Sequence, residues 1–262
     1  MFGNILASVI LLSLGELAWA RDVLFVTLGI VSLLGAFLFI PMPSVEGAYH
    51  DKHPSLLDTS RLAFTDARMA LMIPLMLTNG MTLAFFLGDF QTDLTCPVAG
   101  SAFTGFVIAT FFGVNAVSSA AWGRLISSGR LSRRLVFFLA ALLVALFLVL
   151  KLMWKAPSNY QLPQGSKDWK MLTTPKASDI IFVFALAAIF AVGDSFFESG
   201  PPMTLQSFYA GSGALVPAMA NYKLWQSLGY AIQFFIAIPL KHLPEVRGLC
   251  GPALVCLVGD PL

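Results

Sequence analysis

Charged side chains are scarce in this sequence: Asp, Glu, Lys and Arg together make up 11% of its 262 residues. Soluble domains carry about 25% charged residues, so a soluble fold of this length would lack the charge to cover its surface. Hydrophobic residues make up 57%, and the mean hydropathy is +0.80. We therefore expect an all-α fold, a multi-pass bundle of transmembrane helices in a lipid bilayer.

Cysteine and histidine are scarce as well. The three cysteines are odd in number and have no metal-ligand spacing, so they give neither a disulfide framework nor a zinc site; they are Cys96, Cys250 and Cys256. His50 and His53 flank Asp51 in a polar stretch, where solvated side chains are the ordinary case. We predict no metal and no cofactor.

Catalytic motifs are missing. The sequence has no G-x-S-x-G, no P-loop, no dinucleotide fingerprint and no H-E-x-x-H, so none of the enzyme classes that these motifs mark is indicated. We do not expect an enzyme. The net charge of +2, with no basic stripe, also argues against a nucleic-acid partner.

What the sequence does contain is a series of apolar runs. Residues 4–20 form a short run and 23–40 a complete span, and we expect the two to pair as a helical hairpin. A membrane-crossing helix needs about 20 apolar residues, which predicts five further spans at 69–88, 102–122, 135–153, 179–198 and 220–240. The last run, 249–259, reaches roughly 16 Å at the helical rise and is too short to cross about 30 Å of hydrocarbon.

The connections between these runs are rich in proline and glycine. Residues 41–68 form a polar linker with a short surface helix expected at 59–68, and 155–178 and 203–219 are expected to be loops. Pro201 and Pro202 should break or kink the preceding helix, and Pro74 and Gly80 predict a bend within 69–88. The many small residues of 102–122 favour tight packing inside the bundle.

A short arginine-rich loop sets the predicted orientation. It carries Gly123, Arg124, Gly129, Arg130, Arg133 and Arg134. Cytoplasmic loops are enriched in Lys and Arg, so we place 123–134 and 41–68 inside the cell and 89–101 outside. Four lysines then fall outside, against the same rule: Lys155, Lys167, Lys170 and Lys176.

Polar side chains are few within the predicted spans. Asn115 lies at mid-helix and serves either an interhelical hydrogen bond or a ligand. Asp194 and Glu198 are four residues apart and share a helical face, so the pair either carries a proton or lies solvated near the inner end of its span. A polar face follows at the start of 220–240, where it should meet a neighbouring helix; it comprises Asn221, Tyr222, Trp225 and Gln226.

Three stretches carry a family resemblance. Ala220–Gly229, Gly88-Asp89-Phe90 with Thr95-Cys96, and the loop Gly123–Arg134 resemble the Unc-93-like branch of the major facilitator superfamily. Ser127 stands where the superfamily loop has an acid that helps latch the two halves together. The loop is thus either a latch without its acid or a positive anchor at the inner surface.

The resemblance implies the C-terminal half of a major-facilitator fold. Residues 1–40 would be one partial and one complete helix of the preceding half, 41–68 the cytoplasmic linker, and 69–262 the C-terminal bundle, truncated in its last helix. It also implies a missing N-terminal half-bundle that would pack on this one. The expected location is an integral membrane position, with plasma membrane and endosomal or endoplasmic-reticulum membranes left open.

For function, the resemblance implies a non-enzymatic accessory protein, either a regulator of a potassium channel or a trafficking partner of membrane receptors. The alternatives are a secondary transporter of a small solute, inactive as this half alone because alternating access needs two bundles, and a non-functional partial product. We predict that five polar residues line the side facing the missing half: Asn115, Asp194, Glu198, Asn221 and Gln226.

Overall fold

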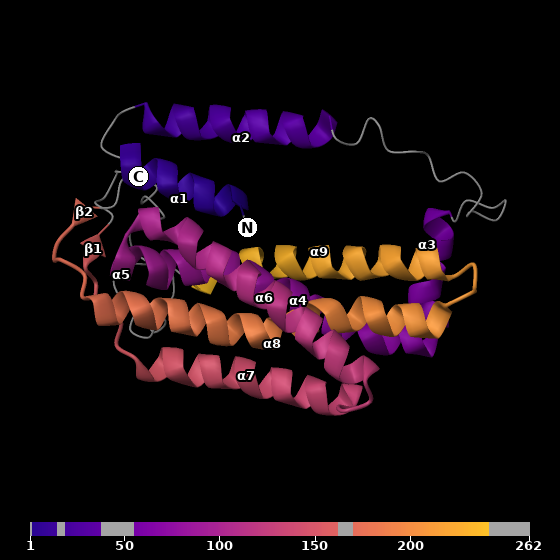
Figure 1. Cartoon of the computed structure of the whole chain (residues 1–262). Helices are drawn as coiled ribbons and strands as arrows, with labels where there is room; N and C mark the ends of the chain where they lie inside the picture. Colours follow the sequence, from indigo (N-terminus) through magenta and orange to yellow (C-terminus); the bar gives the residue numbers. More distant parts are fainter. Residues whose placement is uncertain (1, 15–18, 38–54, 162–169, 241–262) are drawn as a thin grey trace.

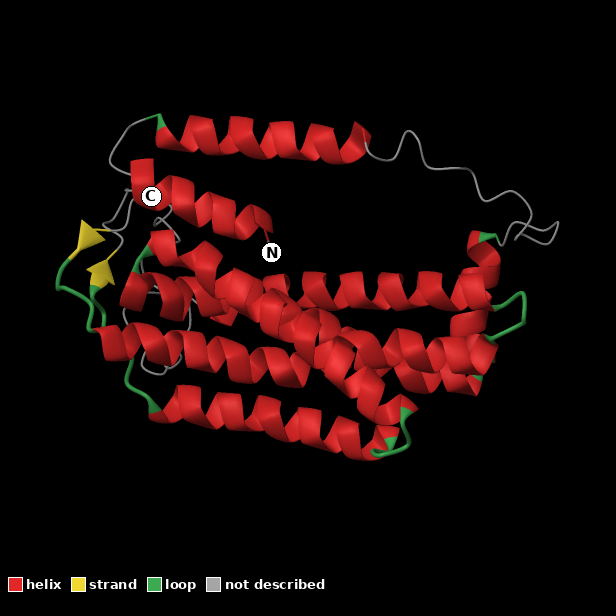
Figure 2. Ribbon diagram, in the orientation of Figure 1, coloured by secondary structure: helices red, strands yellow, loops and turns green. Residues whose placement is uncertain are grey.

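The computed structural model describes residues 2–14, 19–37, 55–161 and 170–240. They form helices and one short pair of strands (Figure 2). In chain order the elements are α1 Phe2–Leu14, α2 Ala20–Phe37, α3 Leu56–Thr65, α4 Ala67–Phe85, the π-helix η1 Phe86–Thr95, α5 Cys96–Ala99, the 3-10 helix η2 Ser101–Phe103, α6 Thr104–Ser127, α7 Arg133–Met153, β1 Tyr160–Gln161, β2 Lys170–Met171, α8 Ala177–Tyr209 and α9 Leu215–Leu240.

Four helical stretches in the described residues are long and apolar enough to cross a membrane. They are Ala67–Ala99, Ser101–Ser127, Arg133–Met153 and Ala177–Tyr209. The prediction of a multi-pass, all-α membrane protein is therefore confirmed. α1 and α2 contain shorter apolar helices, and α9, which fills the last predicted span, carries polar residues in its first half.

The long helices run side by side along one direction (Figure 1). α4 packs on α9, α8 packs between α6 and α7, and α1 joins α6 and α2. α3, the α6–α7 turn and the α8–α9 connection lie at one end of the bundle, whereas α5 and the strands lie at the other. α3 and the arginine loop thus lie at the same end of the bundle, and the assignment of that end to the cytoplasm stays a prediction. The histidines, residues 41–54 and the run 249–259 lie outside the described residues.

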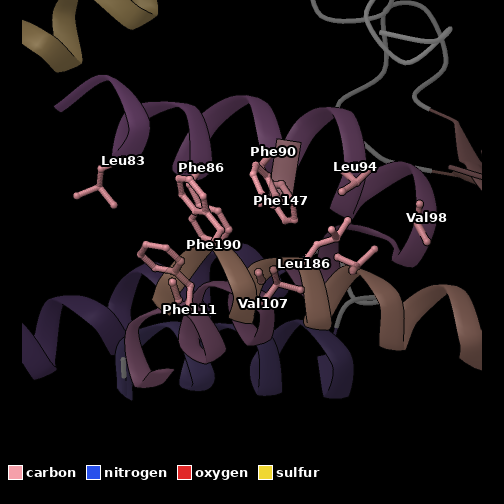
Figure 3. Packing of buried hydrophobic residues seen from close by; sticks show 13 residues of the cluster. Leu83, Phe86, Phe90, Leu94, Val98, Val107, Phe111, Phe147, Leu186 and Phe190 are labelled. Carbon is pink, nitrogen blue, oxygen red and sulfur yellow. The ribbon is translucent and has the colours of Figure 1, made fainter. Parts of the chain in front are cut away.

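Stacked phenylalanines form the core between α4, η1, α6, α7 and α8 (Figure 3). The rings of Phe86 and Phe111 stack with centroids 4.1 Å apart, and Phe147 and Phe190 close the cluster at 4.7 Å. Aromatic pairs in these geometries add about 0.5–1.5 kcal/mol each beyond their buried area. Rings from four helices therefore fix how the helices sit against one another.

The first long helix runs beyond its predicted end. We expected an external loop at 89–101, but the chain stays helical through η1 and α5 to Ala99. Phe86, Phe90, Leu94 and Val98 recur every four residues and all enter the core. A π-helix has a wider turn than an α-helix, so this spacing keeps one apolar face on the core although acids lie between.

The prolines of α8 do not end it. α8 is one helix of 33 residues that contains both Pro201 and Pro202, and the predicted loop 203–219 shrinks to the few residues between Tyr209 and Leu215. Within the predicted loop 155–178, Tyr160–Gln161 and Lys170–Met171 pair as antiparallel strands. These two elements were not predicted from the sequence.

Two glycines set the contact between α4 and α9. A Cβ built on Gly80 would collide with the Gln226 carbonyl oxygen, and one built on Gly229 would collide with the Leu77 carbonyl oxygen. The two backbones therefore touch at this crossing, as small residues allow in membrane helices. Gly229 closes the polar stretch Ala220–Gly229, and this contact explains its residue type.

We predict that Gly229→Ala lowers stability by about 1–3 kcal/mol, because the added methyl group overpacks a backbone contact. Gly123→Ala is the matched control, since no atom lies within 4 Å of a Cβ at Gly123; it should be neutral or slightly stabilising. The measurement is thermal unfolding of the purified protein in detergent. Equal melting temperatures for the two variants would contradict the close crossing.

Candidate functional site

Asp194 lies at the junction of three helices. It is fully buried on α8. Its Oδ1 accepts a hydrogen bond from Thr82 Oγ1 of α4 at 3.4 Å, and its Oδ2 accepts one from Asn115 Nδ2 of α6 at 3.3 Å. Of the two alternatives predicted for Asp194, the one that places it solvated near the inner end of its span is therefore wrong. Because α8 continues to Tyr209, Asp194 falls near the middle of the helix.

The surroundings of Asp194 hold further acidic and phenolic groups. Glu198, one turn along α8, is partly buried, and the phenols of Tyr222 and Tyr230 on α9 lie within electrostatic range of both carboxyls. The two donors to Asp194 are neutral. Among the described residues no cationic side chain hydrogen-bonds to Asp194, and a carboxylate without such a partner is costly within a membrane.

The network continues along the α6–α8 interface. Ser119 Oγ lies 3.5 Å from Asn115 Oδ1 and donates to the Ser195 carbonyl at 3.1 Å. Trp122 Nε1 donates to Ser195 Oγ at 3.0 Å. The interhelical hydrogen bond predicted as one role of Asn115 is therefore present, and it belongs to a row of polar contacts that joins α6 to α8.

A second polar group joins α4 to α9. Gln226 Nε2 donates to Asn79 Oδ1 at 2.5 Å and to the Tyr222 hydroxyl at 3.3 Å, and Lys223 Nζ donates to Gln226 Oε1 at 2.9 Å. Asn79 is fully buried. The polar face predicted for α9 thus meets a neighbouring helix as expected, beside the glycine crossing.

Asn221 serves a different contact from Asp194. Its Nδ2 donates to the Thr59 carbonyl of α3 at 2.7 Å and to the Pro217 carbonyl at 3.1 Å. This fully buried amide fastens the surface helix to the start of α9. The structure therefore joins Asn115 to Asp194 directly, whereas Asn221 and Gln226 bond to other partners. That all five face a missing half stays a prediction.

The remaining residues of the family signature also contact other helices. Asp89 Oδ2 accepts a hydrogen bond from Gln233 Nε2 of α9 at 3.0 Å. Trp225 packs against the buried cluster that contains Met69, Met76 and Leu205. The signature is thus the set of contacts that positions α9 against α3, α4, η1 and α8.

Tyr222 makes a bond that sequence reasoning missed. Its hydroxyl donates to the Glu198 carbonyl at 3.1 Å. In a regular helix that carbonyl accepts the N–H of the residue four positions on, which is Pro202 and has no N–H. Neighbouring helices commonly satisfy carbonyls freed by proline in membranes. The four-residue spacing from Glu198 to Pro202 is visible in the sequence, and it indicates that the Glu198 carbonyl needs a partner from another helix.

Two hollows between these helices are lined mainly by apolar side chains. One of about 330 Å³ lies between α4, α7, α8 and α9 and includes Thr82, Phe147 and Gln233. Another of about 540 Å³ lies between α1, α6 and α8 and includes Ile5 and Phe184. In the described ranges, no three His, Cys, Asp or Glu side chains gather in a way that would hold a metal ion.

We predict that Tyr222→Phe lowers stability by about 0.6 kcal/mol and at most about 1.7 kcal/mol, the average and the maximum measured for interhelical hydrogen bonds in membranes. In a Pro202→Ala background the same change should cost clearly less, because the substituted alanine supplies the missing N–H to the Glu198 carbonyl. Thermal unfolding of the four proteins gives the coupling energy. Tyr230→Phe is the matched control and should be additive with Pro202→Ala. An additive result for Tyr222→Phe would refute the proline explanation.

Comparison with known proteins gives the family. The chain matches the family model "UNC-93: Ion channel regulatory protein UNC-93" over residues 1–257. It is 26% identical to Protein unc-93 homolog A of Bos taurus over 240 residues, covering 85% of this chain and 47% of the relative. UNC93-like protein 3 of Arabidopsis thaliana is 25% identical over 254 residues, covering 90% of this chain and 50% of the relative.

A third relative is the Putative potassium channel regulatory protein unc-93 of Caenorhabditis elegans, 28% identical over 196 residues, or 70% of this chain and 24% of the relative. No solved structure matches the chain. The chain spans about half the length of the first two relatives. Because the family model matches nearly all of its residues and the fold is a bundle of membrane helices, the chain belongs to the UNC-93 family, a relative of the major facilitators.

Proposed function

We propose that the chain acts in a membrane protein that regulates an ion channel, with a potassium channel as the first candidate. The family model is described as an ion channel regulatory protein, and one relative is named as a putative potassium channel regulator. Regulation requires a stable membrane surface that contacts the channel, and it requires no solute pathway.

The observation that carries this proposal is how the buried polar side chains are used. Asn79, Asn115 and Gln226 bond to other side chains of the bundle, and Asn221 bonds to backbone carbonyls. None of these four side chains lines either of the two hollows described above, whose walls are mostly apolar. Polar groups that recognise a solute converge on a cavity, whereas these hold helices together.

Asp194 favours a second candidate, a transporter coupled to protons or small cations. Ionisable residues within the membrane commonly belong to ion or proton pathways, and Asp194 is fully buried with neutral hydrogen-bond partners. Both candidates are proposals about the whole protein, because this sequence covers only part of the relatives' length.

Expression of the native protein in oocytes, with and without a panel of potassium channels, separates the two. Under the channel-regulator proposal, the protein changes current amplitude or voltage dependence for at least one channel and carries no coupled flux when expressed without it. Under the transporter alternative, proton- or cation-coupled current appears without any channel, and Asp194→Asn abolishes it.

Asp179→Asn is the matched control, because Asp179 lies in the first turn of the same helix and undergoes the same chemical change. It should leave both readouts unchanged. The regulator proposal would be overturned by a coupled current that appears without any channel, persists in Asp179→Asn and disappears in Asp194→Asn. Surface expression of each variant is measured by biotinylation.

A further inference from the structure

The turn between α6 and α7, residues 123–134, is a well-formed structure and is here called the arginine turn. Gly129 has a φ of +71°, and the Arg130 N–H donates to the Leu125 carbonyl while the Gly129 N–H donates to the Ile126 carbonyl. This pattern is a Schellman motif, which ends a helix on a glycine. Ser132 then caps α7 by accepting from the Leu135 N–H at 3.3 Å.

The four arginines of this turn have no acidic partner in the part of the chain that the structure describes. Arg124, Arg130, Arg133 and Arg134 are all exposed. Ser127, at the position of the superfamily acid, donates its hydroxyl back to the Arg124 carbonyl at 3.1 Å. Arg133 donates to the neutral Ser207 hydroxyl of α8 at 3.1 Å.

Helix stability does not explain these charges. Arg133 and Arg134 begin α7, and the positive end of the helix dipole lies there and disfavours cations. Four guanidinium groups in one short turn also repel each other. An anion that binds them would remove both costs, because a guanidinium donates two parallel hydrogen bonds to a phosphate or carboxylate.

The surface next to the arginines is apolar. Leu135, Phe138 and Leu142 follow at helical spacing along α7, and they are 43%, 65% and 55% exposed. Arg134 lies one turn before Phe138. α6 and α7 are both long and apolar enough to cross the membrane, so the turn that joins them lies at the bilayer surface, with the exposed face of α7 at the depth of acyl chains.

We propose that the arginine turn is a binding site for the phosphate of an anionic phospholipid, whose acyl chains lie along Leu135, Phe138 and Leu142. Charge above an exposed apolar stripe matches a lipid better than a free anion, which would use only the charge. The arginine density predicts that this end is cytoplasmic, and the cytoplasmic leaflet carries the anionic lipids. The site is independent of whether the protein regulates a channel or moves a solute.

The test titrates the purified native protein in neutral detergent with dioctanoyl phosphatidylserine, with binding measured by native mass spectrometry and by thermal shift. Each basic residue near a surface strengthens anionic-lipid binding about fivefold. The triple variant Arg130→Gln, Arg133→Gln, Arg134→Gln should therefore bind on the order of a hundredfold more weakly. These side chains are exposed, so the variant should fold.

The opposite end of the bundle supplies the matched control. Lys155, Lys170 and Lys176 are exposed there, and their triple change to Gln removes the same charge. It should leave affinity within about twofold, because charges separated from the site by more than a Debye length are screened. A loss equal to that of the arginine variant would overturn the site in favour of general charge attraction.

Two further titrations identify which part of the lipid is recognised. Inorganic phosphate and dioctanoyl phosphatidylcholine should each bind much more weakly than phosphatidylserine, since one lacks acyl chains and the other lacks net charge. Equal binding of inorganic phosphate would overturn the lipid assignment. If the triple Gln variant does not give monodisperse protein, the single variant Arg130→Gln replaces it. It should bind about fivefold more weakly, and unchanged binding would overturn the site.

Discussion

Hydrocarbon offers no hydrogen bonds, so polar groups within a membrane bundle are satisfied by other parts of the protein. This constraint organises the structure. The Asp194 carboxyl takes hydrogen bonds from α4 and α6, Gln226 bonds to Asn79 across α4 and α9, and Tyr222 satisfies the carbonyl that Pro202 leaves free. Each bond joins two helices. The polar residues that looked like candidate ligands in the sequence therefore also determine which helices are neighbours.

These bonds depend on how closely the helices approach. The α4–α9 crossing brings backbones into contact at Gly80 and Gly229, and the Gln226 side chain meets Asn79 beside that contact. A larger residue at either glycine would separate the helices and lengthen the hydrogen bond as well. The hydrogen bond between the polar side chains thus depends on the close backbone approach that the small residues allow. Van der Waals contact drives this approach, because membrane helices gain no hydrophobic burial when they leave lipid for each other.

The sequence predicted the helices far better than it predicted their ends and partners. Apolar runs located the bundle because hydrophobic length alone reports a span. Pro201 and Pro202 suggested a helix end because the group that satisfies the freed carbonyl, Tyr222, is on another helix. The predicted helix end also determined where Asp194 was expected. A span that ends at residue 198 places Asp194 near water, whereas a helix that continues to Tyr209 places it near the middle of that helix. The acids Asp89 and Asp93 suggest a loop at 89–99, whereas the apolar repeat Phe86, Phe90, Leu94 and Val98 keeps this stretch helical.

α8 connects the buried Asp194 to the arginine turn. It carries Asp194 at its centre, Pro201 and Pro202 in its second half, and Ser207, the partner of Arg133, in its last turns. A helix with two prolines has fewer backbone hydrogen bonds to resist bending, and Tyr222 of α9 replaces one of them. Bending of α8 at these prolines would therefore alter the surroundings of Asp194 and the contact of Ser207 with Arg133 together.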